Sequence, residues 1–191
     1  MQNKPIKEER MRRYFVDSCK ELLLGEGLRA LSVRNVAERA GYSFATIYSY
    51  FKDLSDLTMT AVGEFLVELK NFVGIDSKGS DDVATITKSY IKYFVQYPSI
   101  YRLMFVEQIS DARYHKTTLD AINSALGELL ADGWSKLAEE RGWSQSEAAT
   151  RARAHDSMVG GMLLSYVNRR LPDDYFKFLE NYDKAFRLFA K

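Results

Sequence analysis

The sequence predicts an all-α protein, and three observations support that fold class. Apolar residues recur at three- and four-residue intervals through most of the 191 residues, the spacing that places side chains on one face of a helix. Strand-like alternation of apolar and polar residues is scarce. Each of the three prolines (Pro5, Pro98 and Pro172) falls where a helix can begin, because the first helical turn tolerates a residue without an N–H.

Four helices are predicted in the first part of the chain. The first covers residues 7–24 and ends at two glycines; its apolar stripe comprises Met11, Tyr14, Phe15, Ser18, Leu22 and Leu23. The second covers residues 33–40 after Ser32 as N-cap, with an inward face of Val33, Val36, Ala37 and Ala40. The third covers residues 44–50 after Ser43. The fourth starts near Asp53 and extends to about residue 73.

A linker-like break at residues 74–80 separates these helices from the rest of the chain. Later helices are predicted at residues 82–96, 99–108, 117–141, 144–169 and 173–190. We expect two domains, residues 1–52 and residues 53–191.

The overall charge excludes a uniformly basic nucleic-acid coat. The formal net charge is +1, so any nucleic-acid binding requires a local basic face, and the first 20 residues do carry six basic against three acidic residues. Cys19, the single cysteine, excludes an internal disulfide, and we expect it in the core of a cytoplasmic protein. No apolar stretch is long enough to cross a membrane, and no signal peptide is recognisable.

Residues 31–57 carry the most informative pattern. They read Leu-Ser-Val-Arg-Asn-Val-Ala-Glu-Arg-Ala-Gly-Tyr-Ser-Phe-Ala-Thr-Ile-Tyr-Ser-Tyr-Phe-Lys-Asp-Leu-Ser-Asp-Leu, which is two short helices joined at Gly41, a helix-turn-helix. Ile47 and Phe51 form the inward face of the second of these helices. Its outward face is uncharged and rich in hydroxyl groups, which can contact base edges and phosphates. That face comprises Phe44, Ala45, Thr46, Tyr48, Ser49 and Tyr50.

This stretch resembles the DNA-binding domain of the TetR family of bacterial regulators. The resemblance rests on Val36-Ala37, Ala40-Gly41-Tyr42-Ser43, Thr46-Ile47-Tyr48, Tyr50-Phe51 and Leu57, and it covers residues 10–60. It implies a helix-turn-helix DNA-binding domain followed by a helical-bundle domain for ligand binding and dimerisation. It also implies contacts with double-stranded operator DNA from Ser32, Arg34, Ser43, Phe44, Ala45, Thr46, Tyr48, Ser49, Tyr50 and Lys52.

Two departures from the family pattern affect these expectations. Ala45 replaces the usual glycine, and Leu54 replaces the usual phosphate-binding lysine, for which Lys52 is the substitute we expect. Tyr48 and Tyr50 have an alternative role as core aromatics, and Arg34 as an ordinary surface arginine.

The second domain is rich in aromatic residues, which pack a helical core or line an apolar effector pocket. The resemblance implies a pocket among the middle helices for an apolar or aromatic small molecule. It would be lined by some of Tyr101, Phe105, Trp134, Met158, Met162 and Tyr166.

The last predicted helix is apolar over too wide an arc for one buried side, and Gly160-Gly161 in the helix before it permit close backbone approach. Together the two helices indicate a homodimer interface. Pairing them would place two recognition helices on successive major grooves. The alternative is that these helices only close the core of the monomer.

Two other classes of function fit the sequence less well. An all-α enzyme is disfavoured, because His115 and His155 lack metal-ligand spacing and no phosphate loop or activated nucleophile is present, so we expect no catalytic residue, metal or cofactor. A helical adaptor that binds protein instead of DNA is the second alternative. Repression is the role that the resemblance implies, and activation stays open.

Overall fold

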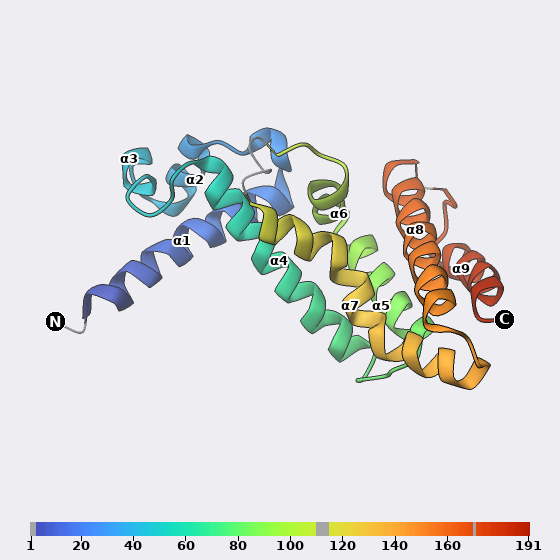
Figure 1. The fold of residues 1–191 in the computed structure, drawn as a ribbon. Coiled ribbons are helices and arrows are strands. Elements are labelled where there is room, and N and C mark those ends of the chain that lie inside the picture. The colour runs from blue at the N-terminus through green and yellow to red at the C-terminus, as the bar shows by residue number, and fades with distance from the viewer. Residues whose placement is uncertain (1–2, 110–114, 170) are drawn as a thin grey trace. The chain divides into compact units, whose positions relative to one another are not determined.

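The chain is helical throughout the part that the structure, a computed structural model, describes: residues 3–109, 115–169 and 171–191 (Figure 1). No strand occurs in these ranges, which confirms the predicted fold class. In chain order the helices are α1 (Asn3–Gly25), the 3₁₀ turn η1 (Leu28–Ala30), α2 (Val33–Ala40), α3 (Phe44–Ile47), α4 (Leu54–Asp76), α5 (Val83–Gln96), α6 (Pro98–Phe105), α7 (Lys116–Arg141), α8 (Gln145–Arg169) and α9 (Tyr175–Phe189).

The helices form two compact units. The first contains Met1–Val67 and Ser99–Ile122, and the second contains Glu68–Pro98 and Asn123–Lys191. Among the described residues, no helix has the length and apolar character that crossing a membrane requires.

In the first unit, α1 packs against α2 and α2 packs against α3. Val36, Ala37, Ile47 and Phe51 are each at most 2% exposed, so the inward faces predicted for the two helix-turn-helix helices are confirmed at these positions. Tyr14 does not belong to the stripe predicted for α1, because its side chain is 56% exposed. The buried stripe of α1 instead includes Val16 and Cys19 beside Phe15, Leu22 and Leu23.

Cys19 is a core residue, as its position in the sequence predicts. Its side chain is fully buried, and this burial raises the pKa of the thiol to about 12. Since the thiolate is the reactive form of cysteine, Cys19 serves packing rather than chemistry.

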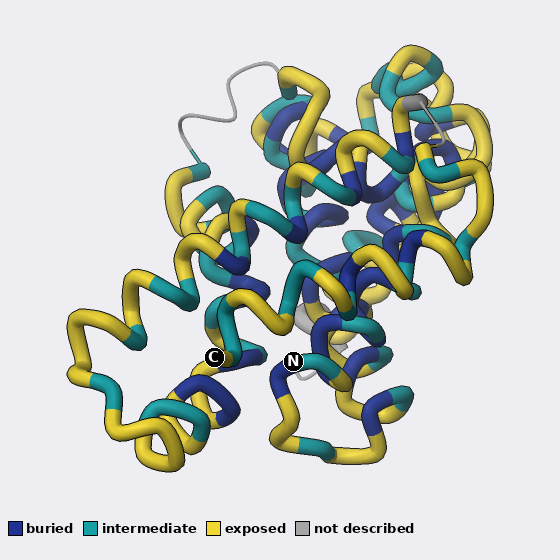
Figure 2. Tube along the Cα trace, turned by 90° about the vertical axis from the view of Figure 1, so that its right-hand side faces the viewer, coloured by how far each residue is buried: buried dark blue, intermediate teal, exposed yellow. Residues whose placement is uncertain are grey.

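In the second unit, α5, α8 and α9 pack against one another. Buried positions recur every three or four residues along these helices, so one side of each helix faces the interior (Figure 2). His155 of α8 is fully buried, and its Nε2 lies 3.2 Å from the hydroxyl of Tyr182 of α9. Aromatic rings surround this histidine; they belong to Trp134, Tyr182, Phe186 and Phe189.

Several helix boundaries differ from those predicted. The third helix ends at Ile47 rather than residue 50, and residues 48–50 continue as a turn. The predicted break at residues 74–80 begins later, because α4 continues to Asp76. Helix α9 begins at Tyr175 because the carboxylate of Asp174 caps it, accepting a hydrogen bond from the N–H of Lys177 at 2.9 Å.

Candidate functional site

The turn between α2 and α3 is fixed by backbone hydrogen bonds at a glycine. Gly41 has φ 75° and ψ 28°, the left-handed conformation that favours glycine, and its N–H points at the carbonyls of Ala37 and Glu38. The N–H of Tyr42 donates to the carbonyl of Ala37 at 2.9 Å. These bonds close the end of α2 and set the direction in which α3 begins, so the predicted helix-turn-helix is present.

The N-terminus of α2 is also fixed by hydrogen bonds. The hydroxyl of Ser32 accepts a hydrogen bond from the N–H of Asn35 at 3.1 Å, which makes Ser32 the N-cap that the sequence predicts. The side chain of Asn35 reaches back to the carbonyl of Ala30 at 2.7 Å. Arg34 lies one position earlier on the exposed side of the same turn.

The outward face of α3 and of the turn that follows it is open to solvent. Phe44 is 61% exposed and Tyr48 53% exposed, and Ala45 and Ser49 are exposed beside them. Thr46 is half-buried, and its hydroxyl lies 2.9 Å from that of Ser43, so these two hydroxyl groups are paired with each other. The structure therefore brings most of the predicted base-contacting residues onto one exposed surface.

Tyr50 has a different environment from Tyr48. It is half-buried, and its ring packs on Phe15 of α1 with the ring centroids 5.9 Å apart. Of the two alternatives considered from the sequence, a packing role therefore applies to the ring of Tyr50, whereas the ring of Tyr48 lies in solvent.

Arg12 of α1 holds the end of this segment, and sequence reasoning did not identify it. Its guanidinium donates a hydrogen bond to the carbonyl of Tyr50 and lies 4.2 Å from the centroid of the Phe51 ring. A guanidinium over an aromatic face is attracted by the ring electrons and satisfies a carbonyl that ends a helical turn. No local pattern signals this contact, since the partners are 38 residues apart.

Lys52 precedes α4 and takes part in the hydrogen bonds that cap the start of this helix. Its N–H donates to the carboxylate of Asp56 at 3.0 Å, and the N–H of Asp56 donates to the carboxylate of Asp53 at 2.8 Å. The side chain of Lys52 is exposed, whereas Leu54, which occupies the position of the family lysine, is half-buried. Lys52 is therefore fixed at its backbone and solvent-facing at its ammonium group.

The predicted effector residues fall into separate groups. Tyr101 and Phe105 of α6 belong to the first unit and pack together with ring centroids 5.0 Å apart; burial raises the pKa of Tyr101 to about 12. Trp134 belongs to the second unit, is 5% exposed, and its indole N–H has no hydrogen-bond partner among the described residues.

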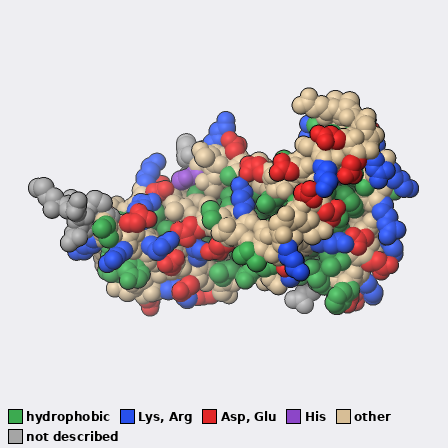
Figure 3. Space-filling model, turned by 90° about the horizontal axis from the view of Figure 1, so that it is seen from below, with side chains coloured by type: hydrophobic (Ala, Val, Ile, Leu, Met, Phe, Trp, Pro, Cys, Tyr) green, Lys and Arg blue, Asp and Glu red, His purple; other side chains and the backbone are tan. Residues whose placement is uncertain are grey.

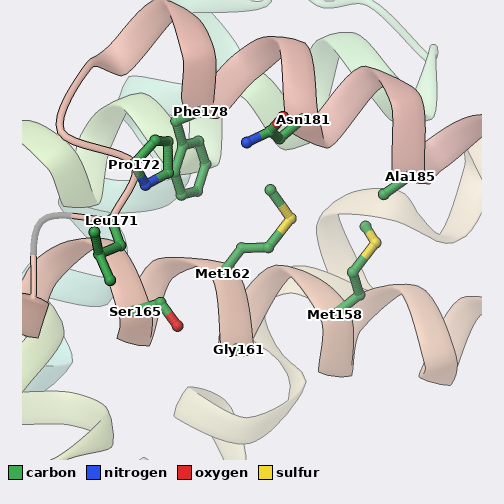
Figure 4. A pocket seen from close by; sticks show the side chains of 9 residues that line it. All are labelled: Met158, Gly161, Met162, Ser165, Leu171, Pro172, Phe178, Asn181 and Ala185. Carbon is green, nitrogen blue, oxygen red and sulfur yellow. The ribbon is translucent and has the colours of Figure 1, made fainter.

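Met158 and Met162 line a hollow of about 530 Å³ between α8 and α9. Figure 4 shows both methionine side chains pointing from α8 toward the helix that carries Phe178, Asn181 and Ala185. Tyr166 is linked to this hollow through Phe178, whose ring centroid lies 5.1 Å from its own. Trp134 instead lines another hollow, with Trp143 and a group of alanines between α7 and α8.

Charges are mixed over the face seen in Figure 3, and the described residues form no cluster of metal ligands. Figure 3 shows Lys and Arg side chains interspersed with Asp and Glu over the face in view. In the part of the chain that the structure describes, no group of three His, Cys, Asp or Glu side chains is placed to hold a metal ion.

Comparisons with known proteins agree with this geometry. The family model described as bacterial regulatory proteins, tetR family, matches residues 16–57. Bacillus subtilis FadR, a transcriptional regulator solved in complex with stearoyl-CoA, is similar over 94% of this chain and 97% of its own, with a TM-score of 0.70 and 13% identity.

Two further solved structures share the fold. Thermus thermophilus FadR, a TetR-family transcriptional repressor in complex with lauroyl-CoA, is similar over 93% of this chain and 92% of its own (TM-score 0.65, 18% identity). A TetR-family regulator from Mesorhizobium loti is similar over 95% of this chain and 96% of its own (TM-score 0.67, 16% identity).

Proposed function

This chain belongs to the TetR family of bacterial transcriptional regulators, and we propose that it is a ligand-responsive repressor that binds a two-fold DNA operator as a homodimer. The observation that carries the proposal is the solvent-exposed outward face of α3, which follows a turn fixed at Gly41. A side-chain surface of this kind, presented by the second helix of a helix-turn-helix, fits the major groove of B-form DNA.

We assign DNA contacts to the residues predicted from the sequence, within a domain of residues 1–52. Phe44, Ala45, Thr46 and Ser49 would lie nearest the bases. Phosphates would be contacted by Tyr48, Tyr50, Lys52 and the start of α2 around Ser32 and Arg34. The complete set is Ser32, Arg34, Ser43, Phe44, Ala45, Thr46, Tyr48, Ser49, Tyr50 and Lys52. Tyr50 is half-buried, so only the exposed part of its side chain would take part.

We place the dimer interface on α8 and α9. Met158, Gly161, Met162 and Ser165 recur along α8 at the spacing of one helix face, and Asn181, Ala185 and Leu188 do so along α9. The hollow between these two rows is mostly apolar, and Leu188, one turn beyond Ala185 on α9, is 69% exposed. A second copy that covers both rows would remove this apolar surface from water, which favours association.

We propose an apolar or aromatic effector bound within residues 53–191, with Tyr101, Phe105, Trp134, Met158, Met162 and Tyr166 as the candidate lining residues. Long-chain acyl-CoA thioesters are suitable first probes, because two of the similar structures contain them. An effector that binds the free dimer more tightly than the DNA-bound dimer must weaken DNA binding by the same factor. If neither acyl-CoA thioesters nor aromatic compounds change operator affinity, the effector proposal fails.

The proposed function is tested by titrating labelled genomic fragments, beginning with the DNA upstream of the gene itself, and following fluorescence anisotropy at two salt concentrations. A sequence-specific regulator retains binding to one fragment at physiological salt in the presence of competitor DNA. Binding that disappears with salt on every fragment would leave only non-specific attraction and refute the proposal.

Replacing Lys52 by alanine is expected to weaken binding on every DNA sequence by a similar factor. If its ammonium neutralises one phosphate per subunit, the slope of log K against log salt becomes less negative by about one for each half-site. Lys136→Ala, which removes an exposed lysine of the second unit outside α8 and α9, is the matched control and should leave the slope unchanged. An unchanged slope for Lys52→Ala would remove this residue from the phosphate contacts.

A further inference from the structure

Helix α3 begins with two exposed apolar residues, although the segment as a whole is rich in hydroxyl groups. The ring of Phe44 is 61% exposed and the methyl group of Ala45 lies exposed next to it. The hydroxyl groups of Ser43 and Thr46, which flank these two residues in the sequence, lie 2.9 Å apart and share one hydrogen bond. The beginning of this segment therefore offers DNA an apolar patch, consisting of Phe44 and Ala45.

Phe44 is not required for the core of the unit. Ile47 and Phe51 supply the inward side of the segment at 0% and 2% exposure, and Phe15 contacts the rings of Tyr42 and Tyr50 behind it. The ring of Phe44 is left mostly in water and contributes little to folding, so it is available to a partner that approaches this face.

The major groove contains one apolar group that such a patch can recognise. Each base pair displays hydrogen-bond donors and acceptors there, and thymine alone adds a C5-methyl group. A phenyl ring and an alanine methyl have no donor or acceptor to pair with the polar edges, but they do pack against a methyl group. Arg34 and Lys52, the cations assigned to phosphates, do not belong to the patch.

We propose that Phe44, with Ala45, reads the C5-methyl group of thymine in each half-site and is thereby a specificity-determining residue. This inference rests on the proposed function, because it requires that the outward face of α3 enters the major groove. It assigns to this surface one chemical feature of the operator, a thymine at a fixed position in each half-site.

The experiment uses an operator duplex selected by the full-length protein from a random-sequence library. Each thymine is then replaced singly by deoxyuridine, which removes only the methyl group, and the dissociation constant is measured by fluorescence anisotropy. We expect one or two thymines per half-site at which the replacement weakens wild-type binding about fourfold, the factor that corresponds to about 0.8 kcal/mol for one buried methyl group.

The Phe44→Ala variant distinguishes this contact from a general effect of the base change. It should bind the thymine operator more weakly than wild type and bind the thymine and deoxyuridine duplexes equally at those positions. Leu24→Ala, which truncates a 41%-exposed apolar residue of α1, is the matched control and should keep the wild-type preference for thymine.

Two results would overturn the proposal, and they are distinguishable. A selected operator that tolerates deoxyuridine at every position, or a Phe44→Ala variant that still prefers thymine, refutes the assignment of Phe44 while leaving sequence-specific binding intact. A library from which no sequence is enriched refutes the proposed function itself, and this inference with it.

Discussion

Replacing Phe51 by alanine is expected to lower the free energy of unfolding of the helix-turn-helix by about 3–5 kcal/mol, the cost typical of truncating a buried phenylalanine. The side chain is 2% exposed, and the Arg12 guanidinium that lies 4.2 Å from its ring centroid also donates to the carbonyl of Tyr50. The substitution leaves a cavity and removes the ring that holds Arg12 in place. Native-state hydrogen exchange of the amides in α2 and α3 measures the loss locally, which is useful in a chain of two units.

Phe44→Ala is the matched control, since it removes the same ring from an exposed position of the same segment. Its effect on the free energy of unfolding should stay within about 0.5 kcal/mol, as is usual for surface substitutions. The two phenylalanines therefore separate stability from DNA recognition. Equal exchange rates in Phe51→Ala and wild type would contradict the packing described for this unit.

Replacing Met162 by glutamate is expected to convert the proposed dimer to a monomer and to weaken operator binding by about 10²–10⁴-fold, the range by which linking two binding modules raises avidity. Met162 points into the apolar hollow between α8 and α9, where a second copy would desolvate the new carboxylate without a partner. Light scattering at micromolar concentration gives the mass, and anisotropy on the same sample gives the operator affinity.

Met162→Leu is the control for this site, because it keeps an apolar side chain of similar volume and should remain dimeric. If Met162→Glu stays dimeric with wild-type affinity, the interface lies elsewhere and the hollow is left to the effector alternative. A wild-type protein that is monomeric at these concentrations would contradict the two-fold operator as well.

The helix-turn-helix could be predicted from sequence because its determinants are local. The cap at Ser32, the left-handed turn at Gly41 and the inward pair Ile47 and Phe51 all depend on residues within a few positions of one another. Helical periodicity likewise gives the fold class, since it needs no knowledge of which helices meet.

The contacts that the sequence does not predict are of two kinds. Some join segments that are far apart in the chain, and others depend on side-chain rotamers. Arg12 reaches Tyr50 and Phe51 across the fold of the first unit, and no spacing rule indicates a partner 38 residues away. The spacing of Tyr14 fits the apolar helix face and predicts burial, yet only the arrangement of neighbouring helices determines how wide the buried arc is. The pairing of Ser43 with Thr46 likewise depends on rotamers that composition does not specify.

The effector residues were the least predictable part of the candidate site. Aromatic and methionine side chains at core spacing serve packing and ligand binding equally well, so sequence alone does not separate the two roles. The structure places Met158 and Met162 at one hollow and Trp134 at another. Each hollow lies between two helices, where apolar side chains also serve helix packing. Their assignment to an effector therefore stays a proposal.

The most direct test of the regulator is the operator affinity of the variant Ala45→Glu, measured beside wild type at physiological salt. Ala45 is an exposed helical residue, so glutamate is tolerated by the fold, but it places a carboxylate on the face proposed to enter the major groove. We predict that binding to the selected operator falls to the level of a shuffled duplex, while the circular dichroism spectrum is unchanged. Operator binding that survives this substitution undiminished would contradict DNA recognition by α3 and favour a different docking surface.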